Sequence, residues 1–190
     1  MTEPFDQTRL RPAGRATREA IATAAREMFD EHGYDGASVR AIASRADIDP
    51  ALVIRHFGSK EELFLEVMQT GDGIQEVLRG PLEAIGRRMV AYFLSDEGEQ
   101  FRNAFLPLTR AAHHPKIGTE LGRRSKELFV DPLVDRLDGE DRELRVLLAG
   151  AQMNGLLNAL FVQRREELLG ASADRIIEIY GDAMQAVLTP

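Results

Sequence analysis

The chain has 190 residues and a net charge of −7, and 44% of its residues are hydrophobic. This length suits either one small module joined to a larger core or a single compact domain. Because the chain contains no cysteine, a disulfide framework, a thiolate zinc site and a cysteine nucleophile are excluded, and a reducing compartment is favoured.

The negative charge is unevenly distributed along the chain. The first 60 residues contain nine Lys or Arg and nine Asp or Glu, so the acidic excess belongs to the C-terminal part. Residues 1–18 contain four arginines against Glu3 and Asp6. A local basic segment of this kind binds phosphates even in an acidic protein, although a solvated tail is the alternative. No apolar run has the length of a secretory signal or a membrane span, so we expect a cytoplasmic protein.

The first predicted elements are an arm and a helix. Residues 1–14 contain proline, glycine and mixed charge without a period, which predicts a flexible arm. From Thr17 the pattern becomes helical, and Gly33 is expected to end this helix. One face of the helix is apolar and consists of Ile21, Ala24, Ala25, Met28 and Phe29.

Two short helices joined by a tight turn follow in the sequence. Ser38 is a suitable N-cap for the first, whose buried face contains Ile42 and Ala43. A turn at 47–49 leads to the second, in which Asp49 acts as the cap and Pro50 takes the first position. This spacing predicts a helix-turn-helix, whose second helix would lie in the major groove of DNA.

The next helix begins at Ser59, where Glu62 completes the pattern of a capping box. Its predicted core residues are Leu63, Phe64, Val67 and Met68. Beyond it the chain remains helical, and no strand signal competes. Helices are expected at roughly 81–95, 98–112, 116–137, 140–168 and 172–188. Pro107 and Pro132 should kink or split the helices that contain them.

Residues 25–64 resemble the DNA-binding domain of the tetracycline-repressor (TetR) family along their whole length. The match requires many positions in register rather than one short motif. The matching residues are Gly33-Tyr34, Ser38-Val39-Arg40, Ile42-Ala43, Ile48, His56-Phe57 and Gly58-Ser59-Lys60. Two places depart from the family pattern. Ile54 replaces the usual tyrosine that reaches a phosphate, and Asp49-Pro50 replaces the usual residues at the start of the recognition helix.

The resemblance implies an all-α fold with two domains. A three-helix helix-turn-helix DNA-binding domain is expected at 15–62, after the arm at 1–14. A helical bundle for ligand binding and dimerisation is expected at 63–190, where the chain resembles the family in length, layout and a Gln152-Met153-Asn154-Gly155 stretch.

The predicted DNA contacts lie on the arm side of the first helix, on both helices of the motif and at the start of the next helix. Arg40 is assigned to a base or phosphate, with a solvent-exposed arginine as the alternative. Small and apolar groups at the start of the recognition helix can read thymine methyls, although Leu52 is also a candidate for the core. Lys60 lies at a helix N-terminus, which favours an anion. Tyr34 is also a candidate for loop packing, and His56 for a plain surface histidine. The full set is Arg15, Thr17, Arg18, Tyr34, Ser38, Val39, Arg40, Pro50, Ala51, Leu52, Arg55, His56, Ser59 and Lys60.

A hydrophobic effector pocket is a second expectation, with ordinary core packing as the alternative for each aromatic residue. Two polar residues, Arg110 and Asn154, are candidates to orient the effector, with a surface salt bridge or a capped turn as the alternative. The expected lining is Tyr92, Phe93, Phe101, Phe105, Arg110, Met153, Asn154 and Phe161.

Two C-terminal stripes predict a homodimer built from two helices of each subunit, unless the stripes pack inside one subunit. The expected interface residues are Leu148, Ala151, Gly155, Ala159, Tyr180 and Met184. His113-His114 is not assigned to a metal, because adjacent residues on a helix point to different faces. We expect no metal and no cofactor.

These expectations describe a homodimeric repressor that leaves a palindromic operator when a small, hydrophobic effector binds. An activator that uses the same domain, or a helical protein-interaction module, is the alternative. An enzyme is not expected, because no nucleophile, base and acid occur in a known pattern.

Overall fold

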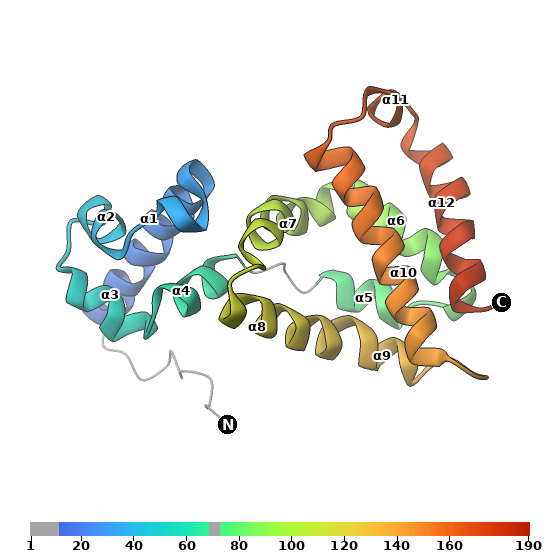
Figure 1. Cartoon of the computed structure of the whole chain (residues 1–190), viewed down its shortest axis with the longest axis horizontal. Helices are drawn as coiled ribbons and strands as arrows, with labels where there is room; N and C mark the ends of the chain where they lie inside the picture. Colours follow the sequence, from blue (N-terminus) through green and yellow to red (C-terminus); the bar gives the residue numbers. More distant parts are fainter. Residues whose placement is uncertain (1–11, 69–72) are drawn as a thin grey trace. The chain divides into compact units, whose positions relative to one another are not determined.

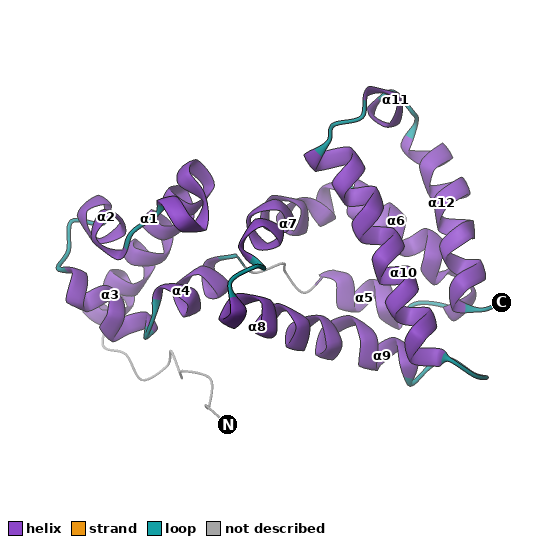
Figure 2. Ribbon diagram, in the orientation of Figure 1, coloured by secondary structure: helices purple, strands orange, loops and turns teal. Residues whose placement is uncertain are grey.

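The computed structural model describes residues 12–68 and 73–190, which form helices joined by short loops, with no strand among them (Figures 1 and 2). The predicted all-α class is therefore confirmed. Contacts divide the chain into two compact units. The first contains Met1–Gln69 and Arg110–Ile117, and the second contains Thr70–Thr109 and Gly118–Pro190.

Most of the first unit consists of four helices. They are α1 (Pro12–Gly36), α2 (Val39–Arg45), α3 (Pro50–Phe57) and α4 (Lys60–Val67). α1 leaves helical geometry at Gly33, whose φ of 68° suits glycine, as expected for the end of this helix. The predicted arm is wrong for residues 12–14, because α1 already begins at Pro12, where proline is tolerated in a first turn. Residues 1–11 lie outside the described residues.

The core of the first unit is formed by the apolar faces that the helical spacing predicted. Its residues with 0% exposure are Ile21, Ala25, Ala37, Ile42, Ala43, Val53, Leu63, Phe64 and Ile117. The rings of Phe29 and Phe64 lie edge to face, with their centroids 4.9 Å apart. Because all four helices contribute to this core, the short helices α2 and α3 gain their stability from packing rather than from length.

The second unit contains the remaining helices. They are α5 (Gly73–Arg79), α6 (Ile85–Leu94), α7 (Glu99–Ala111), α8 (Pro115–Ser125), α9 (Asp131–Val134), α10 (Arg142–Leu157), α11 (Glu166–Leu169) and α12 (Ala173–Leu188), of which the end of α7 and the start of α8 belong to the first unit. The sequence did not predict α5. Its three buried residues, Ile74, Val77 and Leu78, have helical spacing, but the segment is short and bounded by glycines.

The two prolines inside predicted helices behave differently. α7 continues through Pro107, so the expected split does not occur there. The predicted helix at 116–137 is divided into α8, a π-helical segment at Lys126–Val130 and α9, with Pro132 in the first turn of α9. Pro132 has no N–H to offer the carbonyl of Leu128, and that carbonyl instead accepts a hydrogen bond from Gln75 Nε2 at 2.8 Å.

One helical stretch of the described residues, Arg142–Val162, is long and apolar enough to cross a membrane by length and composition, and 33% of its 18-residue apolar part is buried inside the structure. The core helix of a soluble protein passes the same test. Its buried residues include Val146, Met153 and Leu157, which pack in the core of the second unit.

Candidate nucleic-acid interface

Side-chain caps fix the geometry of the helix-turn-helix. Ser38 Oγ accepts a hydrogen bond from the Ala41 amide at 3.1 Å, and an Asp49 carboxylate oxygen accepts one from the Ala51 amide at 2.7 Å. Both predicted N-caps are therefore confirmed. Between them the chain turns at Asp47, whose φ is 54°. Each helix of the motif thus begins at a residue that the sequence specifies locally.

The outer face of this motif is formed by residues that the core does not use. Arg40, Pro50, Ala51 and Arg55 are exposed. Among the described residues, neither Arg40 nor Arg55 has an ion-pair partner, so both guanidinium groups are available to an external anion. Other predicted contacts are less open: Val39, Leu52, His56, Ser59 and Lys60 are half-buried, and Ser38 is exposed but acts as a cap. On α1, Arg15 is exposed and Thr17 is half-buried.

Arg18 does not fit the predicted role of a DNA contact, and this assignment is corrected. Its residue exposure is 7%, and its guanidinium carbon lies 4.1 Å from the centroid of the Phe57 ring. One nitrogen donates to the backbone carbonyl of His56, and another lies 2.5 Å from a carboxylate oxygen of Glu66. Arg18 therefore joins α1 to the end of α3 and to α4, because a buried guanidinium must satisfy its donors within the protein.

Of the two roles open to Tyr34, a phosphate contact and packing, the structure agrees with packing. It is 9% exposed, and its ring lies edge to face against Phe64 with centroids 5.0 Å apart. Burial and the neighbouring Glu61 raise the pKa of Tyr34 to about 12. The ammonium of Lys60 lies 4.1 Å over the same ring, so Tyr34 positions Lys60 instead of contacting DNA itself.

Lys60 and His56 keep their predicted places near the start of α4 and the end of α3. Ser59 caps α4 by accepting a hydrogen bond from the Glu62 amide at 3.1 Å, which leaves Lys60 in the first turn. Burial, together with the charges of Arg18 and Arg55, lowers the pKa of His56. The imidazole is therefore neutral near neutral pH and would offer a phosphate an N–H donor rather than a full charge.

Sequence reasoning missed one candidate on the recognition helix. Ile54 is 45% exposed on α3, where Val53 and Phe57 are the buried residues. An exposed isoleucine in the middle of a recognition helix can contact a thymine methyl. The sequence contained one indication of this role, because Ile54 stands where the family usually has a tyrosine that contacts DNA. The nearby Arg45 is not available, because Glu31 accepts two of its hydrogen bonds at 2.9 Å each.

The predicted effector residues fall into two groups. The aromatic residues lie in the second unit, where Phe93 and Phe101 have ring centroids 4.6 Å apart and Phe129, which the sequence did not suggest, joins them. Tyr92, Phe105 and Met153 are buried in the same core, and Phe161 packs against it. Arg110 and Asn154 are corrected: both are exposed, and Arg110 belongs to the first unit. Residue 154 points away from the core because residues 153 and 157 of α10 point into it.

One polar side chain that the sequence did not suggest, Arg102, lies at the aromatic cluster. Arg102 donates to the backbone carbonyl of Phe93 at 3.1 Å, and its guanidinium lies 5.7 Å from the centroid of the Phe161 ring. On α10, Gln152 Oε1 is buried and has no hydrogen-bond partner among the described residues. A buried amide oxygen without a donor is costly, so it is a natural acceptor for a ligand donor.

The predicted dimer stripe is largely exposed, with one correction. Leu148, Ala151 and Gly155 are exposed on α10, and Ala159 is half-buried. Tyr180 is half-buried, and its hydroxyl donates to the Gln152 carbonyl at 2.6 Å. Met184 has 0% exposure and packs in the core of its own subunit, so it cannot contact a partner. Leu144, which shares the predicted stripe, is 52% exposed, and Leu147 and Ile179, which the prediction omitted on these two helices, are 51% and 55% exposed.

Comparisons with known proteins identify the same two regions. Residues 21–67 match the family described as bacterial regulatory proteins, tetR family, and residues 83–188 match the tetracyclin repressor-like C-terminal domain. The chain is 33% identical to a TetR-family regulator from Streptomyces coelicolor A3, with 95% of this chain and 98% of that chain covered and a TM-score of 0.65.

Two further proteins are similar to this chain in a more limited way, one over part of its sequence and one in its fold. The HTH-type transcriptional repressor AcnR of Corynebacterium efficiens is 36% identical over 77 residues, which covers 35% of this chain and 41% of the relative. The chain therefore matches less than half of that relative. NalD of Pseudomonas aeruginosa, the secondary repressor of the MexAB-OprM multidrug efflux pump, has a TM-score of 0.69 at 22% identity, with 93% of this chain and 98% of NalD covered. At that identity the likeness concerns the fold.

Proposed function

Because this chain belongs to the tetR family of helix-turn-helix transcriptional regulators, which are not enzymes, we propose that it is a cytoplasmic repressor controlled by a small molecule. The observation that supports DNA binding most directly is the exposed face of the helix-turn-helix, on which the guanidinium groups of Arg40 and Arg55 have no partner within the described chain. The name of the relative AcnR, a transcriptional repressor, supports repression rather than activation.

The proposed operator contacts divide into two kinds. Arg40, Arg55, His56 and Lys60 neutralise or bond phosphates and fix the position of the protein on the duplex. The start of α3, at Pro50–Leu52, lies where base edges would be read in the major groove. Arg15, Thr17, Ser38, Val39 and Ser59 flank these contacts and complete the proposed interface.

We propose two functional domains: a DNA-binding domain at 15–62, and a domain for effector binding and dimerisation at 63–190. The compact units separate later, at 69/70, because the buried face of α4 packs with the DNA-binding helices. A dimer would place two recognition helices on one palindromic operator, since a two-fold pair of motifs matches two half-sites.

The proposed effector is a small hydrophobic molecule that contacts the aromatic cluster of the second unit. Tyr92, Phe93, Phe101, Phe105, Met153 and Phe161 supply the apolar surface. The unpartnered Gln152 Oε1 would accept a hydrogen bond from the effector. Release from DNA requires the effector to bind the non-operator state more tightly than the operator state.

Selection of duplexes from a random pool, followed by fluorescence anisotropy on the selected duplex, tests the DNA-binding assignment. We expect Arg40→Ala to weaken binding by about 1–3 kcal/mol. Lys60→Ala should lower the slope of log affinity against log salt concentration by about 1, which corresponds to the loss of one phosphate contact. Arg79→Ala is a matched control, because Arg79 is an exposed arginine of the second unit. Equal affinities of all four proteins would overturn the proposed interface.

The same experiments separate the alternatives. If the wild-type chain selects no duplex, it is a protein-interaction module. If it selects a duplex but raises the output of a reporter gene placed beside that duplex, it is an activator. Repression of the reporter, relieved by an added effector, is the expected result.

A further inference from the structure

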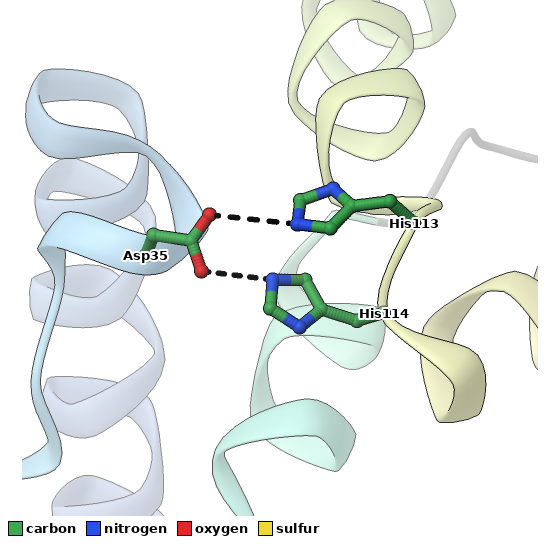
Figure 3. A group of neighbouring side chains, drawn as sticks. All are labelled: Asp35, His113 and His114. Atoms are coloured by element: carbon green, nitrogen blue, oxygen red, sulfur yellow. Dashed lines mark hydrogen bonds and ion pairs between the residues drawn. The ribbon is translucent and has the colours of Figure 1, made fainter.

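Three side chains with metal-ligating atoms meet at one edge of the first unit. Asp35 lies in the last turn of α1, after the break at Gly33. His113 and His114 lie in the short turn between α7 and α8 (Figure 3). This turn belongs to the same compact unit as Asp35, so the meeting is a feature of one packed body.

The geometry places two imidazoles and one carboxylate around a common point. His114 Nε2 lies 2.8 Å from one Asp35 oxygen, and His113 Nε2 lies 3.9 Å from the other. One nitrogen of each ring and one Asp35 oxygen all lie within 4.8 Å of one another. Figure 3 shows both rings turned toward the carboxylate.

Adjacent residues point to different faces only when they lie on a helix, which was the reason against a metal at His113 and His114. The structure removes that reason, because α7 ends at Ala111 and α8 begins at Pro115. In the turn the two rings lie side by side, with centroids 4.2 Å apart and planes inclined by 38°.

Both rings are held in place by contacts beyond the three residues. His113 Nδ1 lies 2.8 Å from the carbonyl of Arg110, which can only accept, so Nδ1–H donates there and Nε2 is the ring nitrogen that faces Asp35. Metal-binding histidines commonly have such a carbonyl partner on the other ring nitrogen. The His114 ring packs edge to face against Tyr34 with centroids 4.7 Å apart, and Tyr34 is itself fixed in the core.

We propose that Asp35, His113 and His114 bind a divalent transition-metal ion of the zinc class, with an open fourth position for water. Two imidazoles and one carboxylate suit zinc, and three protein ligands with an open position form an established type of zinc site. Ligand atoms about 2.0–2.1 Å from a tetrahedral ion lie about 3.3 Å apart. The three ligand atoms lie within 4.8 Å of one another, and His114 Nε2 is 2.8 Å from an Asp35 oxygen, so the side chains need only rotate to reach that spacing.

The metal site does not depend on the proposed function in DNA binding. A bound ion would join the end of α1 to a turn that lies 79 residues further along the chain. Since the ion binds the folded chain and not the unfolded one, it would raise the thermal stability of the protein.

Titration with zinc chloride alone, on full-length protein first stripped with a chelator and desalted, tests the proposal. The chain has four histidines and no cysteine, so few competing sites exist. We expect one zinc ion per chain by isothermal titration calorimetry and a rise in the melting temperature on adding zinc. Asp35→Asn and the double variant His113→Asn/His114→Asn should each weaken binding at least 10-fold and abolish that rise.

His32→Asn is the matched control, because His32 forms an exposed pair with Glu31 at 3.5 Å but has no second histidine beside it. Its zinc binding should equal that of the wild type. Circular dichroism of the zinc-free proteins shows whether each variant is folded. If the double variant does not fold, Asp35→Asn still tests the site, because asparagine has nearly the same shape as aspartate. No stoichiometric binding by the wild type, binding retained by both site variants, or an equal loss in His32→Asn would overturn the site.

Discussion

Arg18 joins three helices of the first unit through one guanidinium group. It contacts the Phe57 ring, the carbonyl of His56 and the carboxylate of Glu66, and its exposure is 7%. The side chain of Glu66 is itself 33% exposed. Removing Arg18 would therefore leave a partly buried carboxylate and a carbonyl without their donors.

We expect Arg18→Met to lower the free energy of unfolding by roughly 2 kcal/mol, because the aliphatic contact with Phe57 is kept while the charged contacts are lost. Urea denaturation followed by circular dichroism measures this loss. Arg15→Met is the control, since Arg15 is exposed on the same helix. If Arg18→Met kept full stability and lost only operator binding, the original assignment of Arg18 to DNA would stand.

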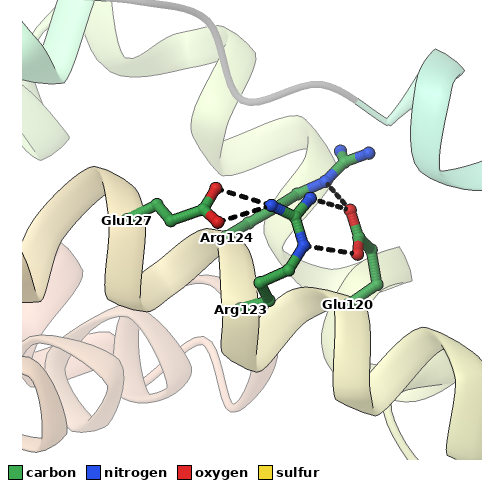
Figure 4. A network of polar contacts seen from close by, with 4 residues as sticks. All are labelled: Glu120, Arg123, Arg124 and Glu127. Carbon is green, nitrogen blue, oxygen red and sulfur yellow. Dashed lines mark hydrogen bonds and ion pairs between the residues drawn. The ribbon is translucent and has the colours of Figure 1, made fainter. Parts of the chain in front are cut away.

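Glu120 is the centre of an ion-pair network on α8 (Figure 4). Hydrogen bonds from Arg123 and Arg124 lower the pKa of Glu120 from its ordinary value of 4.5 to about 2. A carboxyl group whose pKa is lower in the folded state stabilises the protein above its unfolded pKa. That contribution is lost as the pH falls toward the folded pKa.

The stability difference between wild type and Glu120→Gln should accordingly be largest above pH 4.5 and shrink toward pH 2. It should be small throughout, because Arg123 is half-exposed and solvent screens the pair. Urea midpoints measured from pH 7 to pH 3 provide the comparison. Glu83→Gln, a change at an exposed glutamate of the same unit, serves as the control. A difference that grew on acidification would contradict the role of Glu120.

At the scale of elements, α6 and α12 approach each other through a pair of glycines. A Cβ on Gly86 would lie 2.3 Å from the carbonyl oxygen of Gly181, and a Cβ on Gly181 would lie 2.7 Å from the Cα of Arg87. The same crossing is bridged by Gln185, whose Oε1 accepts from the Gly86 amide at 2.9 Å. Arg87 and Asp182 form an ion pair beside it, with a shortest separation of 2.5 Å.

Gly181→Ala should therefore force the two helix backbones apart and cost about 1–3 kcal/mol of stability. Gly122→Ala is a matched helical control, because a Cβ at Gly122 would meet nothing within 4 Å. That change should stabilise α8 by up to about 1 kcal/mol, since alanine is the better helix former. Urea denaturation measures both effects. Equal behaviour of the two variants would show that the close approach is not tight.

At the scale of the whole molecule, α10 and α12 carry large apolar residues that a single chain leaves exposed to solvent. Leu144, Leu147, Leu148 and Ile179 are each about half-exposed or more. Large exposed apolar residues gathered on neighbouring helices mark interaction surfaces. A second copy of the chain is the occupant consistent with the proposed two-fold operator.

We expect Leu147→Glu/Leu148→Glu to convert the dimer to a monomer, because two buried carboxylates without partners would face each other. Light scattering after size exclusion should then fall from twice the chain mass to 21.2 kDa. Leu169→Glu is the control, since Leu169 is an exposed leucine on α11. A wild-type chain that is already monomeric would contradict the proposed dimer.

The sequence alone determined the features that depend on neighbours within a few residues. Ser38, Asp49 and Ser59 cap helices because each hydroxyl or carboxylate reaches an amide two or three positions away. The apolar spacing around Ile21 and Ile42 likewise identified the buried faces of their helices. Together with the family resemblance, these local rules were enough to place the helix-turn-helix.

Only the tertiary structure decided which polar side chains are free. Arg18 and Arg40 look alike in the sequence, but Arg18 is held by Glu66, 48 residues away, whereas Arg40 is exposed. The meeting of Asp35 with His113 and His114, like the glycine crossing of α6 and α12, joins residues far apart in the chain. Such contacts depend on how helices pack, and a local pattern of residues contains no information about the partner that packing brings near.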